Sequence, residues 1–255
     1  MSRLLGRVPS RRDTRTLTLR RYLAPNALPA APPSRDWPHP ATAPAWGLYR
    51  NSELGDCTCA AIGHMLQAAA ANTGRPPPPI TDADVVALYR QAGGYDPARP
   101  ETDQGAQMID VLRLMRDGGL AGRKIGAFAA LDPASRVQVE AAVNLFGAAY
   151  VGVDLPIAAQ TQTVWDVSPA GRYDASYQPG SWGGHAMALL GYDRTHVTFV
   201  TWAAVKVATV EWFMTYCGEA WAVIDPLWIG DAGLAPSGFN AELLAADLAQ
   251  IGAAR

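Results

Sequence analysis

The chain has 255 residues, of which 49% are hydrophobic and 17% are charged, with a formal net charge of −2 at pH 7. This composition is typical of a globular protein with a substantial core and excludes disorder as the main state. With a net charge near zero, the chain has no excess of basic residues that would indicate nucleic-acid binding. No apolar run reaches the roughly 18 residues that span a bilayer.

The first 46 residues are predicted to form an arm, basic at first and then rich in proline. Seven of the first 21 residues are arginine. No apolar core or cleavage site follows them, so the segment does not read as a secretory signal; a transit peptide is the alternative to an arm packed on the body. The sequence leaves open whether this arm covers a functional cleft.

Four helices are predicted in the first half of the body, from hydrophobic periodicity and helix-end signals. The first is expected to have Asp56 as its N-cap, and Asp103 is expected to cap the third. The predicted helices are residues 58–72, a segment starting at Thr81, a segment after Asp103 that ends at Gly118-Gly119, and residues 135–145.

Strands dominate the second half of the body. They are predicted at residues 149–155, 186–192, 197–202 and 220–224, with a short helix at 211–216 and a terminal helix at 240–251. Helices followed by strands predict an α+β fold with two segregated lobes. We expect an arm at 1–46, a two-lobed domain at 47–230 and a helical tail at 231–255.

The residues best suited to chemistry are Cys57 and His185. Cys57 follows Gly55-Asp56 at the predicted start of a helix, and His185 follows two glycines at the start of an apolar strand. A thiol at a helix N-terminus with a histidine base is a common way to generate a thiolate at neutral pH. The two are 128 residues apart, near the roughly 130–150 that separate nucleophile and base in papain-type enzymes.

These two motifs resemble the papain-like cysteine peptidases (C1-type). The resemblance covers about residues 47–225 and implies a helical lobe and an antiparallel β-rich lobe with the active-site cleft between them. The family places a glutamine six residues before its nucleophile as an oxyanion donor, and Asn51 stands there. The Gly-Asp-Cys-Thr and Gly-Gly-His motifs also resemble those of uncharacterised papain-fold proteins carried by phages and prophages.

The third member of the catalytic set departs from the family. The family orients its histidine with an Asn in an Asn-Ser-Trp-Gly stretch, whereas this chain has Val200-Thr201-Trp202-Ala203. Aligning the tryptophans puts Val200 at the Asn position, and counting sixteen residues on from the histidine gives Thr201. The expected partner of the imidazole is the Thr201 hydroxyl or a backbone carbonyl.

A long segment at 160–181, rich in Gly, Pro, Ser and Tyr, leads into His185, and long loops in compact domains are usually functional. We expect the substrate to be bound by residues of this loop and of the glycine turns beside the nucleophile and the base. The candidates are Gly55, Trp165, Trp182, Gly183, Gly184 and Trp202.

The remaining cysteines and histidines are interpreted as structural. Cys59 is the alternative nucleophile but most simply belongs to the core, as does Cys217. His64 lies about 10 Å along the helix from Cys57, too far to act as its base. Cys57, Cys59 and His64 lack a fourth ligand for zinc, so no metal and no cofactor are expected.

The function predicted from the sequence is hydrolysis of a peptide or amide bond through a thioester acyl-enzyme. Three alternatives remain open: an amide ligase or acyltransferase that uses the same intermediate, a papain-fold binding or phage-associated module without activity, and a murein amidase. The expected partner is a peptide or amide substrate, with no nucleic acid and no membrane. Three cysteines, too few for a disulfide scaffold, favour a reducing cytoplasm.

Overall fold

The computed structural model describes residues 3–11, 13, 16–19, 31–37, 45–168, 174–229 and 235–237. The predicted tail helix at 240–251 lies outside these residues. The helices are α1 (Cys57–Asn72), α2 (Asp82–Gly93), α3 (Met108–Asp117), α4 (Arg136–Phe146) and α5 (Val210–Tyr216), with 3₁₀ turns at Pro100–Thr102, Ile157–Gln160 and Ala175–Tyr177.

The strands are β1 (Arg7–Val8), β2 (Arg35–Asp36), β3 (Ala106–Gln107), β4 (Ala127–Leu131), β5 (Ala149–Leu155), β6 (Val164–Trp165), β7 (Gly183–Tyr192), β8 (His196–Thr201), β9 (Ala204–Thr209) and β10 (Cys217–Ile224). Eight of them form one sheet in the order β4-β10-β5-β7-β8-β9-β6, with β2 paired to β7. Its pairings are antiparallel except for β6 with β9.

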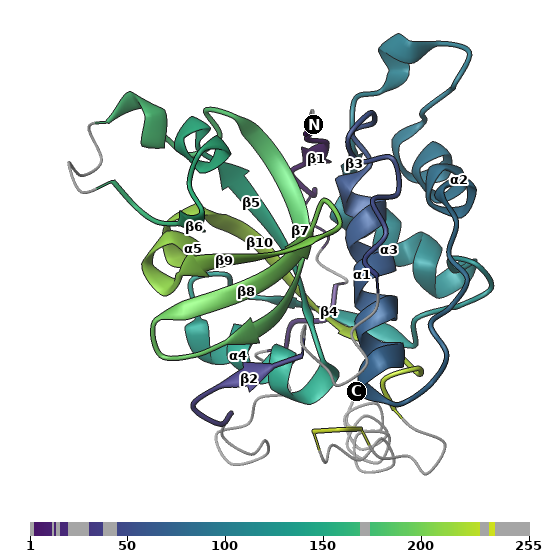
Figure 1. Cartoon of the computed structure of the whole chain (residues 1–255). Helices are drawn as coiled ribbons and strands as arrows, with labels where there is room; N and C mark the ends of the chain where they lie inside the picture. Colours follow the sequence, from purple (N-terminus) through teal and green to yellow (C-terminus); the bar gives the residue numbers. More distant parts are fainter. Residues whose placement is uncertain are drawn as a thin grey trace.

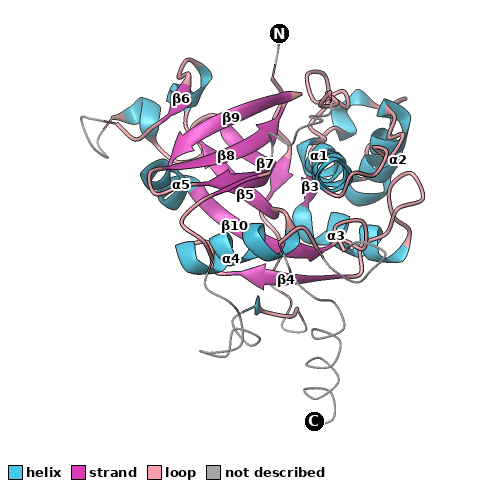
Figure 2. Cartoon of the chain, turned by 60° about the horizontal axis from the view of Figure 1, so that its bottom comes forward, coloured by secondary structure: helices cyan, strands magenta, loops and turns pink. Residues whose placement is uncertain are grey.

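Both faces of the sheet are covered, which produces two lobes. Figure 2 shows α1, α2 and α3 gathered on one side of the sheet. Their apolar side chains pack on one face of β7, through Ala188 and Leu190, while Met187 and Leu189 point into the cluster that contains α4 and α5. This alternation is the period-2 pattern of a strand buried on both sides. The mixed α+β architecture with a mostly antiparallel sheet confirms the predicted fold class.

Several helix ends follow from local chemistry, and one predicted cap, Asp103, is wrong. Thr81 caps α2 in a capping box with Asp84, which satisfies two otherwise free backbone amides. Asp56 occupies the N-cap position of α1, but its side chain makes no capping hydrogen bond. Asp103 does not cap α3, whose N-cap is Gln107, because its carboxylate binds elsewhere.

The described parts of the arm are packed on the body. In Figure 1 the segment labelled β1 runs between the β-rich lobe and the helices. β1 pairs in parallel with β3, β2 pairs with β7, and Leu19 is buried in the cluster behind the sheet. The arm therefore contributes strands and core residues to both lobes. None of the helices in the described part of the chain has the length and hydropathy to cross a membrane.

Candidate active site

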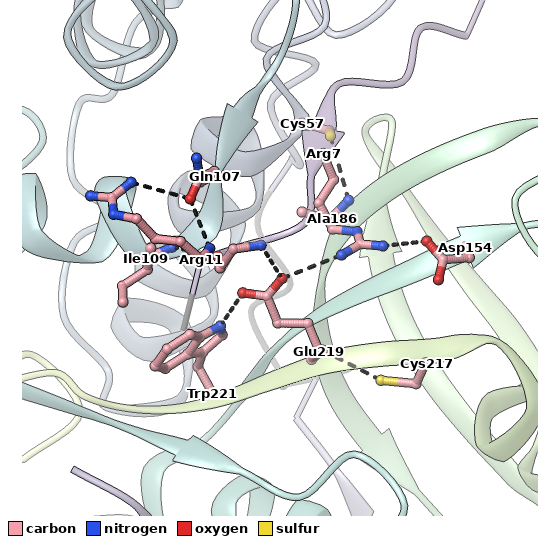
Figure 3. A network of polar contacts seen from close by, with 11 residues as sticks. Arg7, Arg11, Cys57, Gln107, Ile109, Asp154, Ala186, Cys217, Glu219 and Trp221 are labelled. Carbon is pink, nitrogen blue, oxygen red and sulfur yellow. Dashed lines mark hydrogen bonds and ion pairs between the residues drawn. The ribbon is translucent and has the colours of Figure 1, made fainter. Parts of the chain in front are cut away.

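Cys57 is the first residue of α1, and α1 packs directly against β7 through the apolar cluster that both share. Its Sγ accepts a hydrogen bond from the backbone N–H of Ala186, at 3.4 Å, as Figure 3 shows. The first amides of a helix have no intrahelical acceptor and favour negative charge nearby. The fold thus places the thiol at a helix N-terminus, against the strand that carries His185.

His185 lies on β7 next to Ala186 and is fully buried. Its Nε2 is 2.7 Å from the Thr201 Oγ1, and its ring stacks on the Trp202 indole with centroids 4.1 Å apart. The other ring nitrogen, Nδ1, is buried and has no hydrogen-bond partner among the described residues. When Nε2–H donates to Thr201, Nδ1 carries the lone pair that a general base needs.

Of the two expected positions for the histidine's partner, the structure selects Thr201. This residue ends β8, and the turn that follows places Trp202 at a positive φ of 46°. Val200 instead points into the core beneath α1. A tight turn at the strand end therefore presents the hydroxyl and the indole to the same imidazole.

The predicted tryptophans have different positions. Trp182 stacks on Trp202 with centroids 5.7 Å apart and remains partly exposed. Trp165, expected to bind substrate, is completely buried in the β-rich lobe and stacks on Trp212. Its indole N–H donates to the carbonyl of Ala159. Trp165 therefore supports the aromatic layer behind the histidine and does not line a cleft.

Asn51, the expected oxyanion donor, is buried in the turn before α1. Its Nδ2 donates to the carbonyl of Leu54 at 3.1 Å and lies 3.5 Å from the carbonyl of Leu4, in the arm. The amide is thus directed at a backbone carbonyl that passes beside the nucleophile turn. A substrate carbonyl would take the place of such a backbone carbonyl as the acceptor for the Asn51 amide.

The nucleophile turn is held by a hydrogen-bond network that sequence reasoning missed. The Asp103 carboxylate accepts hydrogen bonds from the Gly55 N–H, at 3.0 Å, and from the Tyr89 hydroxyl, at 2.5 Å. The same hydroxyl accepts from the N–H of Gly105, beside β3. One carboxylate therefore fixes the turn before Cys57 relative to α2 and β3, which is why Asp103 does not cap α3.

The arm runs across this site. The Leu4 N–H donates to the Asn51 carbonyl at 3.3 Å, and the Gly6 carbonyl accepts from the N–H of Ala106 at 2.8 Å. The Gly6 backbone passes so close to Gly55 that a Cβ at Gly6 would overlap the Gly55 carbonyl. A side chain at Gly184, one of the predicted substrate-binding glycines, would collide with the Arg7 carbonyl.

Gly183, the glycine before it, is close to the arm as well, because a Cβ there would lie 2.9 Å from Leu5 Cδ1. Predicted glycines on both sides of the site therefore contact the arm. The backbone of the arm therefore covers the site from Gly55 to Gly184.

Burial keeps both catalytic candidates neutral. Burial raises the pKa of the Cys57 thiol to about 12, although the amides of Ala186 and Gly6 lower it in part. Burial likewise lowers the pKa of His185 to about 3, with smaller contributions from nearby positive groups. At neutral pH the covered site holds a thiol and an uncharged imidazole, a pair without nucleophilic thiolate.

The other two candidates on α1 are core residues. Cys59 and His64 are buried in α1, and the His64 Nε2 is 2.7 Å from the carbonyl of Gly47. Burial lowers the pKa of His64 to about 4, so it is neutral. No group of three potential metal-ligating side chains occurs in the described part of the chain.

Two lobes that meet where a thiol on a helix N-terminus lies against the strand that carries a histidine define a papain-like fold. No protein-family model and no curated protein matches the chain. Among solved structures it is similar to xylellain, a cysteine protease from Xylella fastidiosa, with 14% identity and a TM-score of 0.62 over 87% of this chain and 96% of that one.

Two further structures show the same likeness. Procathepsin B S9 from Trypanosoma congolense has 12% identity and a TM-score of 0.59 over 87% of this chain and 86% of that one. Bromelain from Ananas comosus, solved with the inhibitor E64, has 15% identity and a TM-score of 0.52 over 76% of this chain and 99% of that one. At such identities the likeness establishes the fold.

Proposed function

We propose that the protein is a cysteine-dependent hydrolase of peptide or amide bonds, with Cys57 as nucleophile and His185 as base. The observation that carries this proposal is the environment of His185. One ring nitrogen is bound to Thr201, the ring is stacked on Trp202, and Nδ1 is left without a partner on the strand that contacts the thiol. A free ring nitrogen alone does not identify a base, because Nδ1 of the core residue His64 is also unpaired. At His185 it is combined with the Thr201 contact, the stacked indole and the neighbouring Ala186 N–H that binds the Cys57 thiol.

The reaction begins with transfer of the thiol proton from Cys57 to Nδ1 of His185. The thiolate then attacks the substrate carbonyl carbon, and the oxyanion accepts hydrogen bonds from the Cys57 N–H, at the start of α1, and from the Asn51 amide. The imidazolium returns its proton to the leaving amine, which leaves a thioester on Cys57. Water, deprotonated by His185, hydrolyses the thioester to a carboxylate and regenerates the thiol.

Thr201 acts as a positioning residue in this scheme. Its hydroxyl accepts the Nε2–H of His185 and so selects the tautomer with a free Nδ1. A hydroxyl, unlike an Asn carbonyl, can also donate to Nε2, which selects the wrong tautomer. We therefore expect slower turnover than with an Asn at this position.

Turnover requires the arm to leave the cleft, because the arm occupies the position of a substrate backbone. The test uses the full chain with Gly6→Ala, which forces the arm away from Gly55, and a library of fluorogenic peptide amides. Cys57→Ala should abolish hydrolysis, whereas Cys59→Ala, a matched change two residues along the same helix, should retain it. Hydrolysis that survives Cys57→Ala, or folded protein without any hydrolysis, would refute the proposal.

The same assay distinguishes hydrolysis from acyl transfer. Both reactions form the thioester on Cys57 and differ only in whether water or an amine resolves it. Adding a free amine during turnover should leave the carboxylate as the main product if the protein is a hydrolase. Amide products in proportion to the added amine would assign it as a transferase instead.

A further inference from the structure

Arg7 in the arm inserts its side chain into a charged pocket beside the candidate nucleophile. The side chain is 3% exposed, and its guanidinium pairs with Asp154 through Nη2 and with Glu219 through Nη1, the latter at 3.3 Å. Figure 3 shows the guanidinium between the two carboxylates, with Cys57 close by. Gly6, the preceding residue, directs its backbone amide at the Cys57 thiol and stabilises the thiolate form.

The pocket is built by the body of the protein. Asp154 lies on β5 and Glu219 on β10, the strand next to it. The Trp221 indole N–H donates to the second Glu219 oxygen at 2.8 Å, so this carboxylate is oriented by the sheet itself. The absence of a side chain at Gly152 leaves space for the aliphatic part of the Arg7 side chain, because a Cβ there would lie 2.5 Å from the Arg7 Cδ.

The pocket requires a cation. Glu219 is 13% exposed, and removing the partner of a largely buried charge leaves that charge uncompensated. A cavity of about 500 Å³ adjoins the guanidinium, between arm residues such as Ser10 and Asp13 on one side and both carboxylates, Trp221 and Ile109 on the other. When the arm leaves, Glu219, held by Trp221, and the more exposed Asp154 face the position that the Arg7 guanidinium vacates.

We propose that Asp154 and Glu219 form a substrate subsite that selects a basic side chain, and that Arg7 is its intramolecular occupant. Each carboxylate binds a different guanidinium nitrogen, and the planar fork of arginine fits such a pair better than the single ammonium of lysine. The substrate class is therefore a peptide with arginine at the position equivalent to Arg7. This inference rests on the proposed function for its relevance to catalysis, but the pocket binds its ligand without turnover.

The test is a binding measurement on the full chain carrying Gly6→Ala, Arg7→Ala and Cys57→Ala, which empties the pocket and prevents cleavage. Alkylation of the double variant Gly6→Ala, Arg7→Ala, which retains Cys57, verifies that the cleft is open. If Cys57 is not labelled, Gly6→Leu is used in place of Gly6→Ala. Calorimetry compares acetyl-Leu-Gly-Arg-Val-amide with the same peptide containing citrulline, a neutral analogue of arginine. The arginine peptide should bind about tenfold more tightly or better.

A further substitution assigns this preference to the pocket. Glu219→Gln keeps an acceptor for Trp221 and should remove the preference for arginine, whereas Glu211→Gln, at an exposed position on α5, should leave it intact. Equal binding of the two peptides, a preference that survives Glu219→Gln, or no binding of either peptide to an open cleft would overturn the subsite. Arginine-selective binding without turnover in the Cys57-containing parent would reject only the proposed hydrolase.

Discussion

The clearest consequence of the covered site concerns the reactivity of Cys57. With the arm in place, burial raises the pKa of this thiol to about 12. At pH 7 such a thiol is ionised to about 10⁻⁵, whereas an ordinary thiol with a pKa near 8.5 is ionised to about 3%. The ratio of these fractions, about 3,000, is the upper limit for the gain in thiolate from loss of burial alone, because α1 and β7 still pack around Cys57 when the arm leaves.

Gly6→Ala is the smallest change that opens the cleft. A Cβ at this position overlaps the Gly55 carbonyl, and a backbone group next to a fixed turn has little freedom to move aside. We expect the rate of Cys57 alkylation by iodoacetamide at pH 7, mapped by mass spectrometry, to rise by up to about three orders of magnitude. His185→Ala in the opened protein should move the onset of labelling to higher pH.

The control is Gly126→Ala, because a Cβ there meets only the Ile224 carbonyl at an ordinary 3.5 Å. This variant should label as slowly as the wild type. Rapid labelling of Cys57 in the wild type at pH 7 would refute the covered site. Equally slow labelling in a folded Gly6→Ala protein would show that the arm does not control access.

Three further outcomes follow from the site. In the opened protein, Thr201→Val should lower kcat by about 10- to 100-fold by removing the acceptor for His185, while Thr201→Asn should retain or increase it, as steady-state kinetics will show. Burial raises the pKa of Asp56 to about 8, so the folded state retains a proton that the unfolded chain releases. Stability should fall as pH rises from about 4 to 8, by up to about 1.4 kcal/mol per pH unit, and Asp56→Asn should flatten this slope in urea unfolding at pH 5 and 8. Tyr89→Phe should cost about 1–3 kcal/mol in the same assay, because the Asp103 carboxylate and the Gly105 amide both lose a partner.

Local sequence patterns were sufficient to predict the two lobes and the central pair. A glycine turn before a small-residue helix located Cys57, and an apolar strand after two glycines located His185. The count from the histidine to Thr201 also predicted a contact. β7 and β8 are adjacent antiparallel strands paired as far as Ala188 and Val200, and the Thr201 hydroxyl meets the His185 ring beyond the last pair. The catalytic roles of these residues, and the relation to phage proteins, stay predictions.

The position of the arm could not be predicted in this way. Arg7 reads as one arginine in a basic segment, because its partners Asp154 and Glu219 lie 147 and 212 residues away. Periodicity reports which residues of one element share a face and contains no information about such distant pairs. Asp103 and Trp165 were misassigned for the same reason. A carboxylate before a helix is typical of an N-cap, and a tryptophan in a loop is typical of a substrate cleft. Only the tertiary contacts show that Asp103 binds Gly55 and Tyr89 and that Trp165 stacks on Trp212.

The arm and a substrate compete for the same cleft, but the arm is tethered to it. A segment attached to its own binding site by a short stretch of chain has an effective concentration in the millimolar range. A free peptide that makes only the same backbone contacts would therefore need to exceed that concentration to displace the arm. Because Asp154 and Glu219 hold Arg7, the carboxylates that we assign to substrate selection also stabilise the closed state. Weakening them should open the cleft and reduce affinity for a basic substrate together, so the closed state and the substrate preference depend on one charge pair.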